Sequence, residues 1–253
     1  MSTSKITLVT GGSRGLGKSM ALHLAAAGTD LILTYHRRVD EATAVVTEIE
    51  SLGRKAVALQ IDVSEVKSFA TFAHNVGEQL RHTWGRTTFD YLVNNAGIDA
   101  AAPFADTTEA DFDRLLNVHF KGVFFLTQTL LPLLADGGGI VNLSTGLTRF
   151  TTPGYAAYAS MKGAVETFTK YLAKELGSRG IRANLVAPGI VKTDFTAAAR
   201  QTHPQLEGYM SAQTALGRIG EPDDIGGVVA FLCSDAARWV NAQRLEASGG
   251  YSL

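Results

Sequence analysis

The fold is decided by eight residues, Thr10-Gly11-Gly12-Ser13-Arg14-Gly15-Leu16-Gly17, which join an apolar run to a segment with helical spacing. Glycine there lets the backbone turn sharply and approach a pyrophosphate without a Cβ in the way. The free N–H groups of the helix that follows supply hydrogen-bond donors and a favourable dipole. We therefore predict that residues 10–17 hold the phosphates of a dinucleotide. A glycine-rich turn needed only for strand–helix packing is the alternative.

Around this loop, short apolar runs alternate with longer stretches of helical spacing. The runs occupy residues 6–10, 31–35, 56–61, 89–93, 139–143 and 181–187, and a weaker one lies near Leu245. They are continuously apolar, which is typical of strands buried on both faces. Gly28, Gly53 and Gly180 each follow a helical stretch, where a left-handed cap favours glycine. The run Gly137–Gly139 predicts a tight turn before the fifth strand.

The alternation of strands and helices, repeated six or seven times, predicts right-handed crossovers and a parallel sheet. Helices would cover both faces of that sheet, which is the α/β class. No Pro-, Ser- or Gly-rich linker and no internal repeat interrupts the pattern, and 253 residues suit one domain. We therefore predict a single domain over residues 1–253.

Composition and charge exclude several other classes of protein. Lys and Arg total 23 against 24 Asp and Glu, a net charge of -1, which argues against non-specific nucleic-acid binding. The single cysteine, Cys233, excludes an internal disulfide, and no His, Cys and carboxylate cluster has metal-ligand spacing. The start lacks a signal-peptide pattern, and no apolar run reaches the roughly 18 residues of a membrane helix. We expect a cytoplasmic protein without metal, membrane or nucleic-acid partners.

The end of the second predicted strand indicates which dinucleotide is bound. An acidic residue about 20 positions beyond the glycines usually binds the ribose hydroxyls of NAD. Here His36, Arg37 and Arg38 come before the first carboxylate, Asp40, and Arg14 lies on the same side. Guanidinium groups attract a 2′-phosphate, which a carboxylate would repel. We therefore predict NADP(H) over NAD(H), the alternative being that the arginines only begin a solvated helix.

Tyr158 and Lys162 lie four residues apart in Tyr-Ala-Ser-Met-Lys, at the start of a helical stretch, so both side chains face the same way. A tyrosine with its ordinary pKa near 10 is a poor base at neutral pH. A close ammonium favours the phenolate, so we predict that Lys162 lowers the pKa of Tyr158.

Several segments taken together resemble the short-chain dehydrogenase/reductase family. They are the glycine loop, Asn94-Asn95-Ala96-Gly97, Asn117, a hydroxyl-bearing strand end at 144–145, the Tyr158/Lys162 pair, and residues 188–193, 217–222 and 248–250. The resemblance spans nearly the whole chain and is strongest to the NADP-dependent, 3-oxoacyl-carrier-protein-reductase-like branch. It implies a doubly wound Rossmann fold with a seven-stranded parallel sheet flanked by helices on both faces. It also implies hydride transfer between a nicotinamide and a carbonyl or alcohol.

The same resemblance implies roles for the catalytic residues. Tyr158 would be the general acid for reduction and the general base for oxidation. Lys162 would hold the nicotinamide ribose and lower the pKa of the tyrosine. Asn117 would anchor a water molecule that links Lys162 to solvent.

One position departs from the family pattern. The substrate-polarising serine generally lies 13 residues before the tyrosine, and here that position is Thr145, with Ser144 one residue earlier. Successive strand residues point to opposite faces, so the two hydroxyl groups are not interchangeable. We predict that Thr145 hydrogen-bonds the carbonyl oxygen of the substrate. The alternative is Ser144, whose other expected role is a backbone-capping or cofactor-side contact.

The resemblance also assigns the residues that hold the cofactor. Asp62 and Val63 match adenine contacts, and residues 95–97 would line the adenine ribose. The nicotinamide carboxamide and phosphates would be clamped by Pro188, Gly189, Ile190 and Thr193. Asn94 would instead brace the sheet. The predicted cofactor-binding residues are Gly11, Ser13, Arg14, Gly15, Leu16, Gly17, His36, Arg37, Asp62, Val63, Asn95, Ala96, Gly97, Tyr158, Lys162, Pro188, Gly189, Ile190 and Thr193.

Substrate choice is expected to depend on a lid at about residues 194–216. Phe150, Tyr155 and Phe195 are interpreted as walls of an apolar pocket, with ordinary packing as the alternative. His203 is expected to be solvated rather than bound to substrate.

These observations predict an NADP(H)-dependent carbonyl reductase or alcohol dehydrogenase for a small, fairly apolar substrate. One alternative is a 3-oxoacyl-carrier-protein reductase, which needs a basic patch at the active-site rim to dock the acidic carrier. Residues 131–140 contain no Lys or Arg, and Lys174 and Arg179 are a modest substitute. A second alternative is a dinucleotide-binding sensor without turnover. From the family we also expect a homo-oligomer, either a tetramer or a dimer.

Overall fold

The structure is a computed structural model that describes residues 4–99, 101–194 and 205–253. Within these residues, seven strands form one parallel sheet in the order β3-β2-β1-β4-β5-β6-β7, which confirms the predicted fold. The strands are β1 (Ile6–Val9), β2 (Asp30–Tyr35), β3 (Ala56–Gln60), β4 (Phe89–Asn94), β5 (Leu134–Leu143), β6 (Arg182–Pro188) and β7 (Arg244–Ala247).

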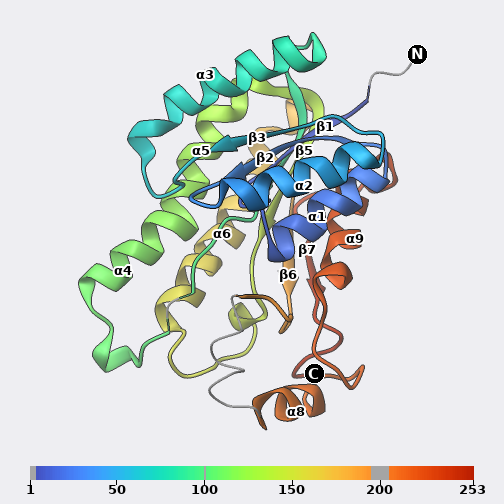
Figure 1. The fold of residues 1–253 in the computed structure, drawn as a ribbon. Coiled ribbons are helices and arrows are strands. Elements are labelled where there is room, and N and C mark those ends of the chain that lie inside the picture. Colours follow the sequence, from blue (N-terminus) through green and yellow to red (C-terminus); the bar gives the residue numbers. More distant parts are fainter. Residues whose placement is uncertain (1–3, 100, 195–204) are drawn as a thin grey trace.

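Helices cover both faces of the sheet (Figure 1). The helices are α1 (Gly15–Ala26), α2 (Val39–Ser51), α3 (Phe69–Gln79), α4 (Glu109–Leu116), α5 (Gly122–Leu130), α6 (Ala156–Glu175), α8 (Gln205–Ala212) and α9 (Pro222–Leu232). Helices α1, α2 and α9 pack on one face, where Val9 points, and α3, α5 and α6 pack on the other, where Leu8 points. Consecutive strand residues thus enter two separate cores, as the pleat of a strand requires.

The central strands are buried and carry a polar brace. Asn94 donates hydrogen bonds from Nδ2 to Asn142 Oδ1 at 2.8 Å and to Thr127 Oγ1 at 3.0 Å, and Asn142 in turn donates to Thr169. All four side chains are buried, and each of these hydrogen bonds pairs polar atoms that would otherwise destabilise the core. The prediction that Asn94 braces the sheet is confirmed.

Gly137–Gly139 form part of β5 and no turn, so that prediction is wrong. The register between β4 and β5 shifts between Phe89 and Tyr91, and Gly137 has φ +76°. A Cβ on Gly138 would lie 2.2 Å from the carbonyl oxygen of Asp90. Glycine is therefore required by an irregularity inside the strand, where the two backbones approach closely.

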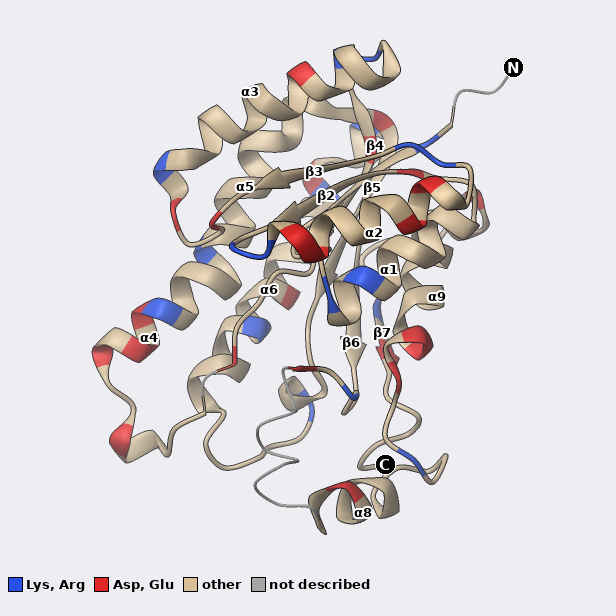
Figure 2. Ribbon diagram, viewed as in Figure 1, with Lys and Arg blue, Asp and Glu red and all other residues tan. Residues whose placement is uncertain are grey.

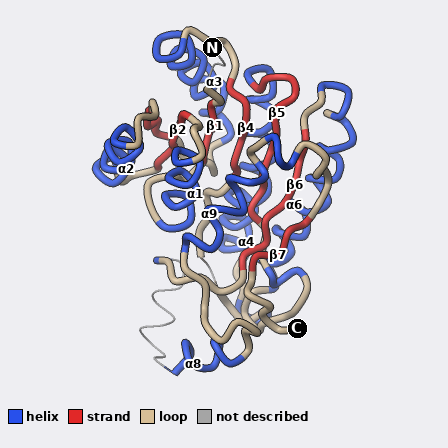
Figure 3. The backbone as a smooth tube through the Cα atoms, turned by 90° about the vertical axis from the view of Figure 1, so that its right-hand side faces the viewer, coloured by secondary structure: helices blue, strands red, loops and turns tan. Residues whose placement is uncertain are grey.

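The functional end of the molecule lies beyond the carboxyl ends of the strands. The strand order reverses between β1 and β4, which is where open α/β sheets bind ligands. Helix α8 and the C-terminal segment lie beyond that edge, and the start of β1 is at the opposite end (Figures 1 and 3). Residues of both charges are interspersed along the ribbon (Figure 2). In the part of the chain that is described, no helix is both long and apolar enough to span a membrane.

Candidate active site

A cavity of about 1710 Å³ opens at the carboxyl edge of the sheet. Ligand pockets usually measure about 300–1,000 Å³, so this one has room for a dinucleotide and a second molecule. Its wall includes every residue predicted for the site. These are Gly11, Ser13, Arg14, Gly15, Leu16, Gly17, His36, Arg37, Asp62, Val63, Asn95, Ala96, Gly97, Asn117, Ser144, Thr145, Tyr158, Lys162, Pro188, Gly189, Ile190 and Thr193.

The glycine loop has the shape of a phosphate cradle. Gly11 and Gly15 have φ +65° and +54°, the left-handed region that favours glycine. A Cβ on Gly17 would lie 2.0 Å from the carbonyl oxygen of Gly11. Asn95 fixes the loop, since its Nδ2 donates to the carbonyl oxygen of Thr10 at 2.8 Å. Among the described residues no side chain caps the first turn of α1, so its N–H groups can bind an anion.

The predicted ribose end contains one cation without an ion pair. Arg14 pairs with Asp194 at 2.7 Å, and Arg38 pairs with Glu41. Arg37 is exposed on the cavity wall and forms no ion pair within the described residues. Its guanidinium is thus available to a 2′-phosphate, as the sequence predicts.

Asp62 lies beside this end of the cavity. His36 Nε2 is 3.2 Å from Asp62 Oδ2, and Ser64 donates two hydrogen bonds to the other carboxylate oxygen. Burial raises the pKa of Asp62, but the hydrogen bonds from Ser64 and the charges of His36 and Arg37 outweigh it, so the pKa is lowered. Asp62 is therefore anionic at neutral pH and can accept hydrogen bonds.

Tyr158 and Lys162 lie one turn apart on α6, with 8% and 4% of their surfaces exposed. Lys162 Nζ lies 5.8 Å from the centroid of the Tyr158 ring and donates a 2.8 Å hydrogen bond to the carbonyl oxygen of Leu143. Burial lowers the pKa of Lys162 to about 8. The ammonium is thus held at the end of β5, directly beside the phenol.

The pKa of Tyr158 moves in the opposite direction to the prediction. Burial raises this pKa above its ordinary value, and the negative charge of Asp99 acts in the same direction, whereas a hydrogen bond with Thr145 lowers it. The predicted lowering is therefore wrong for the site as described, because burial dominates the pKa of Tyr158. A phenol with a raised pKa stays protonated at neutral pH, which is the form a general acid requires.

The two adjacent hydroxyl groups face different partners. Thr145 hydrogen-bonds with the side chain of Tyr158, whereas Ser144 donates to Glu166 Oε1 at 2.6 Å. Both residues line the cavity, but only Thr145 joins the tyrosine. The geometry therefore agrees with Thr145 as the hydroxyl beside the reacting atoms and leaves its catalytic role as a prediction.

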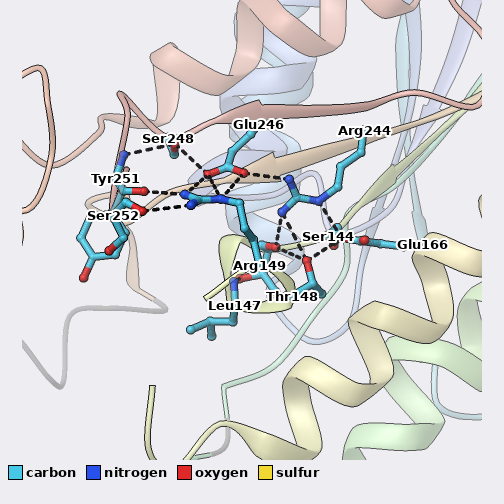
Figure 4. A network of polar contacts seen from close by, with 11 residues as sticks. Ser144, Leu147, Thr148, Arg149, Glu166, Arg244, Glu246, Ser248, Tyr251 and Ser252 are labelled. Atoms are coloured by element: carbon cyan, nitrogen blue, oxygen red, sulfur yellow. Dashed lines mark hydrogen bonds and ion pairs between the residues drawn. The ribbon is translucent and has the colours of Figure 1, made fainter. Parts of the chain in front are cut away.

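A charged network that the sequence did not reveal fixes the segment around Thr145 (Figure 4). Arg244 on β7 pairs with Glu166 at 2.9 Å and with Glu246 at 2.8 Å, and its Nη2 donates to the carbonyl oxygen of Thr145 at 3.0 Å. Arg149 binds both carboxylate oxygens of Glu246 and holds its pKa at about 2. We call Arg149, Glu166, Arg244 and Glu246 the charged network.

The charged network extends to the C-terminal segment. Arg149 donates to the carbonyl oxygens of Tyr251 at 2.6 Å and Ser252 at 2.9 Å, and the rings of Phe150 and Tyr251 lie 5.1 Å apart. Tyr251 and Ser252 both line the cavity. Residues about 100 positions apart in the sequence thus form one wall.

His119 is a second residue that the sequence did not reveal. It lies in a π-helical turn, Asn117–Lys121, with 1% of its surface exposed, and its ring stands nearly perpendicular to that of Tyr158 at 5.0 Å. Asn117 also lines the cavity but is half-buried. The structure therefore places His119 against the tyrosine, and the proton-route role of Asn117 stays a prediction. The signal in the sequence that could have identified this residue is a histidine between the apolar residues Val118 and Phe120.

Part of the predicted lid, residues 195–204, lies outside the described residues, and so do the predictions for Phe195 and His203. The described remainder includes α8, from which Tyr209 and Met210 line the cavity. Within the described ranges, no group of three His, Cys, Asp or Glu side chains could hold a metal ion.

Comparison with known proteins decides the family. A sequence profile described as "Enoyl-(Acyl carrier protein) reductase" matches residues 11–252. The chain is 38% identical to a hydroxynaphthalene reductase-like protein of Metarhizium brunneum, over 97% of this chain and 94% of the relative. A short-chain dehydrogenase/reductase variant from Serratia marcescens shares 30% identity and superposes with a TM-score of 0.88, covering 98% of both chains.

The chain belongs to the short-chain dehydrogenase/reductase family. It is therefore an NAD(P)-dependent oxidoreductase. The angucycline C-6 ketoreductase LanV, solved with bound NADP, shares 36% identity and superposes with a TM-score of 0.93, covering 99% of this chain and 96% of LanV. In this chain the glycine cradle and the Tyr158/Lys162 pair line one cavity.

Proposed function

We propose that this short-chain dehydrogenase/reductase reduces the carbonyl group of an apolar substrate with NADPH, and that Tyr158 is the general acid. One observation carries the proposal: Tyr158, Thr145 and Lys162 meet on the wall of the cavity that also contains the glycine cradle. A fold alone does not specify a reaction, so these side chains carry the assignment.

The residues divide the work of reduction between them. The dinucleotide, when bound, supplies the hydride to the carbonyl carbon. The Thr145 hydroxyl hydrogen-bonds the carbonyl oxygen and thereby orients it. Tyr158 donates its phenolic proton to that oxygen as charge develops there, and the Lys162 ammonium stabilises the phenolate that remains. In the predicted scheme Lys162 also binds the nicotinamide ribose, and Asn117 anchors the water that returns a proton.

NADP(H) is the proposed cofactor because Arg37, which forms no ion pair within the described residues, presents its guanidinium at the predicted ribose end of the cavity. The NADP bound to LanV supports this choice. We expect Arg37→Ala to raise the KM for NADPH about tenfold, since one charge-assisted hydrogen bond contributes about 1.5–3 kcal/mol. The KM for NADH should stay within about twofold. Equal effects on the two cofactors, measured by steady-state kinetics, would assign Arg37 to another role.

The substrate proposed is an apolar ketone that carries an aromatic ring. Beside the residues predicted to bind the cofactor, the cavity wall carries aromatic and aliphatic side chains, which include Ile98, Leu147, Phe150, Tyr155, Tyr209, Met210 and Tyr251. Such a wall favours a flat, apolar ligand through burial and ring contacts. One relative is named a hydroxynaphthalene reductase-like protein and one neighbour an angucycline ketoreductase, which supports the same substrate class.

The contacts of Arg179 weaken the alternative function, a 3-oxoacyl-carrier-protein reductase. This residue pairs with Asp136 at 2.7 Å and donates to the carbonyl oxygens of Leu131 and Leu134, so its charge is already occupied. Docking of an acidic carrier would require unpaired basic groups at the rim. A non-catalytic sensor would have no need of the buried Tyr158/Lys162 pair.

The test is NADPH oxidation with four substrates: a bicyclic aromatic ketone, an aliphatic ketone, a small 3-oxoacyl thioester and the same acyl group on a carrier protein. We expect the highest kcat/KM for the aromatic ketone and a loss of about 10²–10⁴-fold in Tyr158→Phe, which removes the proton but keeps the ring. A preference for the carrier-bound thioester would favour the alternative. Tight NADPH binding without turnover of any of the four would favour the sensor.

A further inference from the structure

His119 makes contacts to two parts of the site at once. Its Nε2 lies 2.8 Å from the carbonyl oxygen of Ile98, which follows the Asn95–Gly97 segment of the cavity wall. Its ring packs almost perpendicular to Tyr158, with 5.0 Å between the ring centroids. The imidazole thus joins the loop after β4 to the phenol on α6.

The contacts of Nε2 determine the tautomer. If Nε2 were bare, its lone pair would face the lone pairs of the Ile98 carbonyl oxygen at 2.8 Å, which is repulsive. The alternative partner, the Ile98 N–H group, is farther away at 3.3 Å. The proton therefore resides on Nε2 and is donated to the Ile98 carbonyl oxygen.

The other ring nitrogen is then a bare acceptor. Nδ1 is buried and has no hydrogen-bond partner among the described residues. It cannot satisfy itself by taking a proton, because burial and then the charge of Lys162 lower the pKa of His119 to about 3. A buried polar atom left in this state costs about 1–3 kcal/mol.

Gly97 lies against this edge of the ring. A Cβ on Gly97 would lie 2.9 Å from Cε1 and 3.5 Å from Nδ1 of His119, so a side chain there would displace the imidazole. His119 also lines the cavity, so the ring borders the site.

We propose that His119 is a positioning residue of the reductase: its Nε2–H group holds the Ile98 carbonyl, and its ring holds the Tyr158 phenol. This deepens the proposed function, because the phenol it holds is the proposed general acid. The groups that face it are Tyr158 and Lys162 on α6 and the backbone of Ile98.

The first test does not depend on activity. The chain has six histidines, and ¹⁵N-histidine labelling with His119→Asn as the assignment variant identifies the His119 signals in the full-length protein. We expect the neutral tautomer with hydrogen on Nε2, unchanged from pH 8 down to pH 5. Hydrogen on Nδ1, or protonation near the ordinary histidine pKa of about 6.5, would overturn the proposal.

The second test separates positioning from packing. His119→Phe keeps a ring but removes both the donor and the acceptor, whereas His119→Asn keeps one of each. We expect kcat to fall about 10–100-fold in His119→Phe and to recover in part in His119→Asn, with the KM for NADPH within about twofold of the parent in both. A matched control is His82→Phe, since His82 also lies in a π-helical turn, Leu80–Trp84, but is exposed.

The outcomes distinguish this inference from the proposed function. If the parent protein reduces the ketone and His119→Phe retains its kcat within about twofold, the ring acts by packing alone and the inference fails while the function stands. If the parent protein reduces no ketone, the proposed function fails and the tautomer measurement still decides the state of His119. If His119→Phe does not fold, kcat of His119→Asn and the tautomer measurement remain as tests.

Discussion

Two groups of residues around the candidate reaction centre differ in chemistry. Leu115, Met161 and the neutral imidazole of His119 pack with Tyr158, and we call them the neutral side. The charged network, with two guanidinium groups and two carboxylates, instead binds the backbone of Thr145. The neutral side raises the pKa of the phenol by excluding water, whereas the charged network holds the backbone of Thr145 with balanced charges. The difference shows that separate sets of residues control the proton affinity of Tyr158 and the position of Thr145.

The largest expected effect distinguishes the two hydroxyl groups, since Thr145 hydrogen-bonds Tyr158 and Ser144 donates to Glu166 of the charged network. Thr145→Val keeps the volume but removes the hydrogen bond to Tyr158 and to the substrate, so kcat should fall about 10²–10³-fold. Thr145→Ser should restore most of the activity. Ser144→Ala removes a donor to Glu166 only, so kcat should fall by less than about tenfold while the melting temperature drops. A larger loss of kcat in Ser144→Ala than in Thr145→Val would reverse the assignment.

The next effect concerns pH and the buried ammonium group of Lys162. Because burial lowers the pKa of Lys162 to about 8, its charge is lost above that pH and reduction should slow by up to about tenfold per pH unit. The stability of the protein depends on pH in the opposite direction to the rate of reduction. Between pH 8 and the ordinary value of 10.5 the unfolded chain binds more protons than the folded one, so the free energy of unfolding rises with pH. Rate profiles test the first effect, and denaturant unfolding of the parent and Lys162→Met tests the second. A rate of reduction that stays constant up to pH 10 would contradict the first effect.

The smallest effect probes the charged network. Arg244→Met keeps the apolar stem but removes the bonds to Glu166, Glu246 and the Thr145 carbonyl, so the free energy of unfolding should fall by about 1–3 kcal/mol. The KM for the ketone should rise as Thr145 loosens. Arg81→Met is the matched control, because its ion pair with Glu78 is exposed and should contribute less than about 1 kcal/mol. Equal losses in the two variants, measured by urea unfolding, would show that the network has no special role.

The nucleotide end could be predicted from the sequence because its function depends on local backbone geometry. Gly11, Gly15 and Gly17 act through their missing side chains, and Tyr158 and Lys162 act through spacing along one helix. Such properties depend on a few residues that lie close together in the sequence. The seven strands were predictable for a similar reason, since buried parallel strands are continuously apolar.

The rest of the site could not be predicted because it depends on packing between distant segments. Glu166 and Arg244 are 78 residues apart and are ordinary polar residues until β7 brings them together. The pKa of Tyr158 was predicted with the wrong sign because the sequence shows the neighbouring lysine but not the extent of burial. The neutral state of His119 depends on burial in the same way.

The attachment of the C-terminal segment has a practical consequence for anyone who handles the protein. Arg149 binds the carbonyl oxygens of Tyr251 and Ser252, two residues that border the cavity. An affinity tag or a surface tether fused after Leu253 would therefore sit at the mouth of the site and pull on Arg149. The same tether fused ahead of β1 would emerge at the far edge of the sheet, so immobilised preparations should be anchored there (Figure 1).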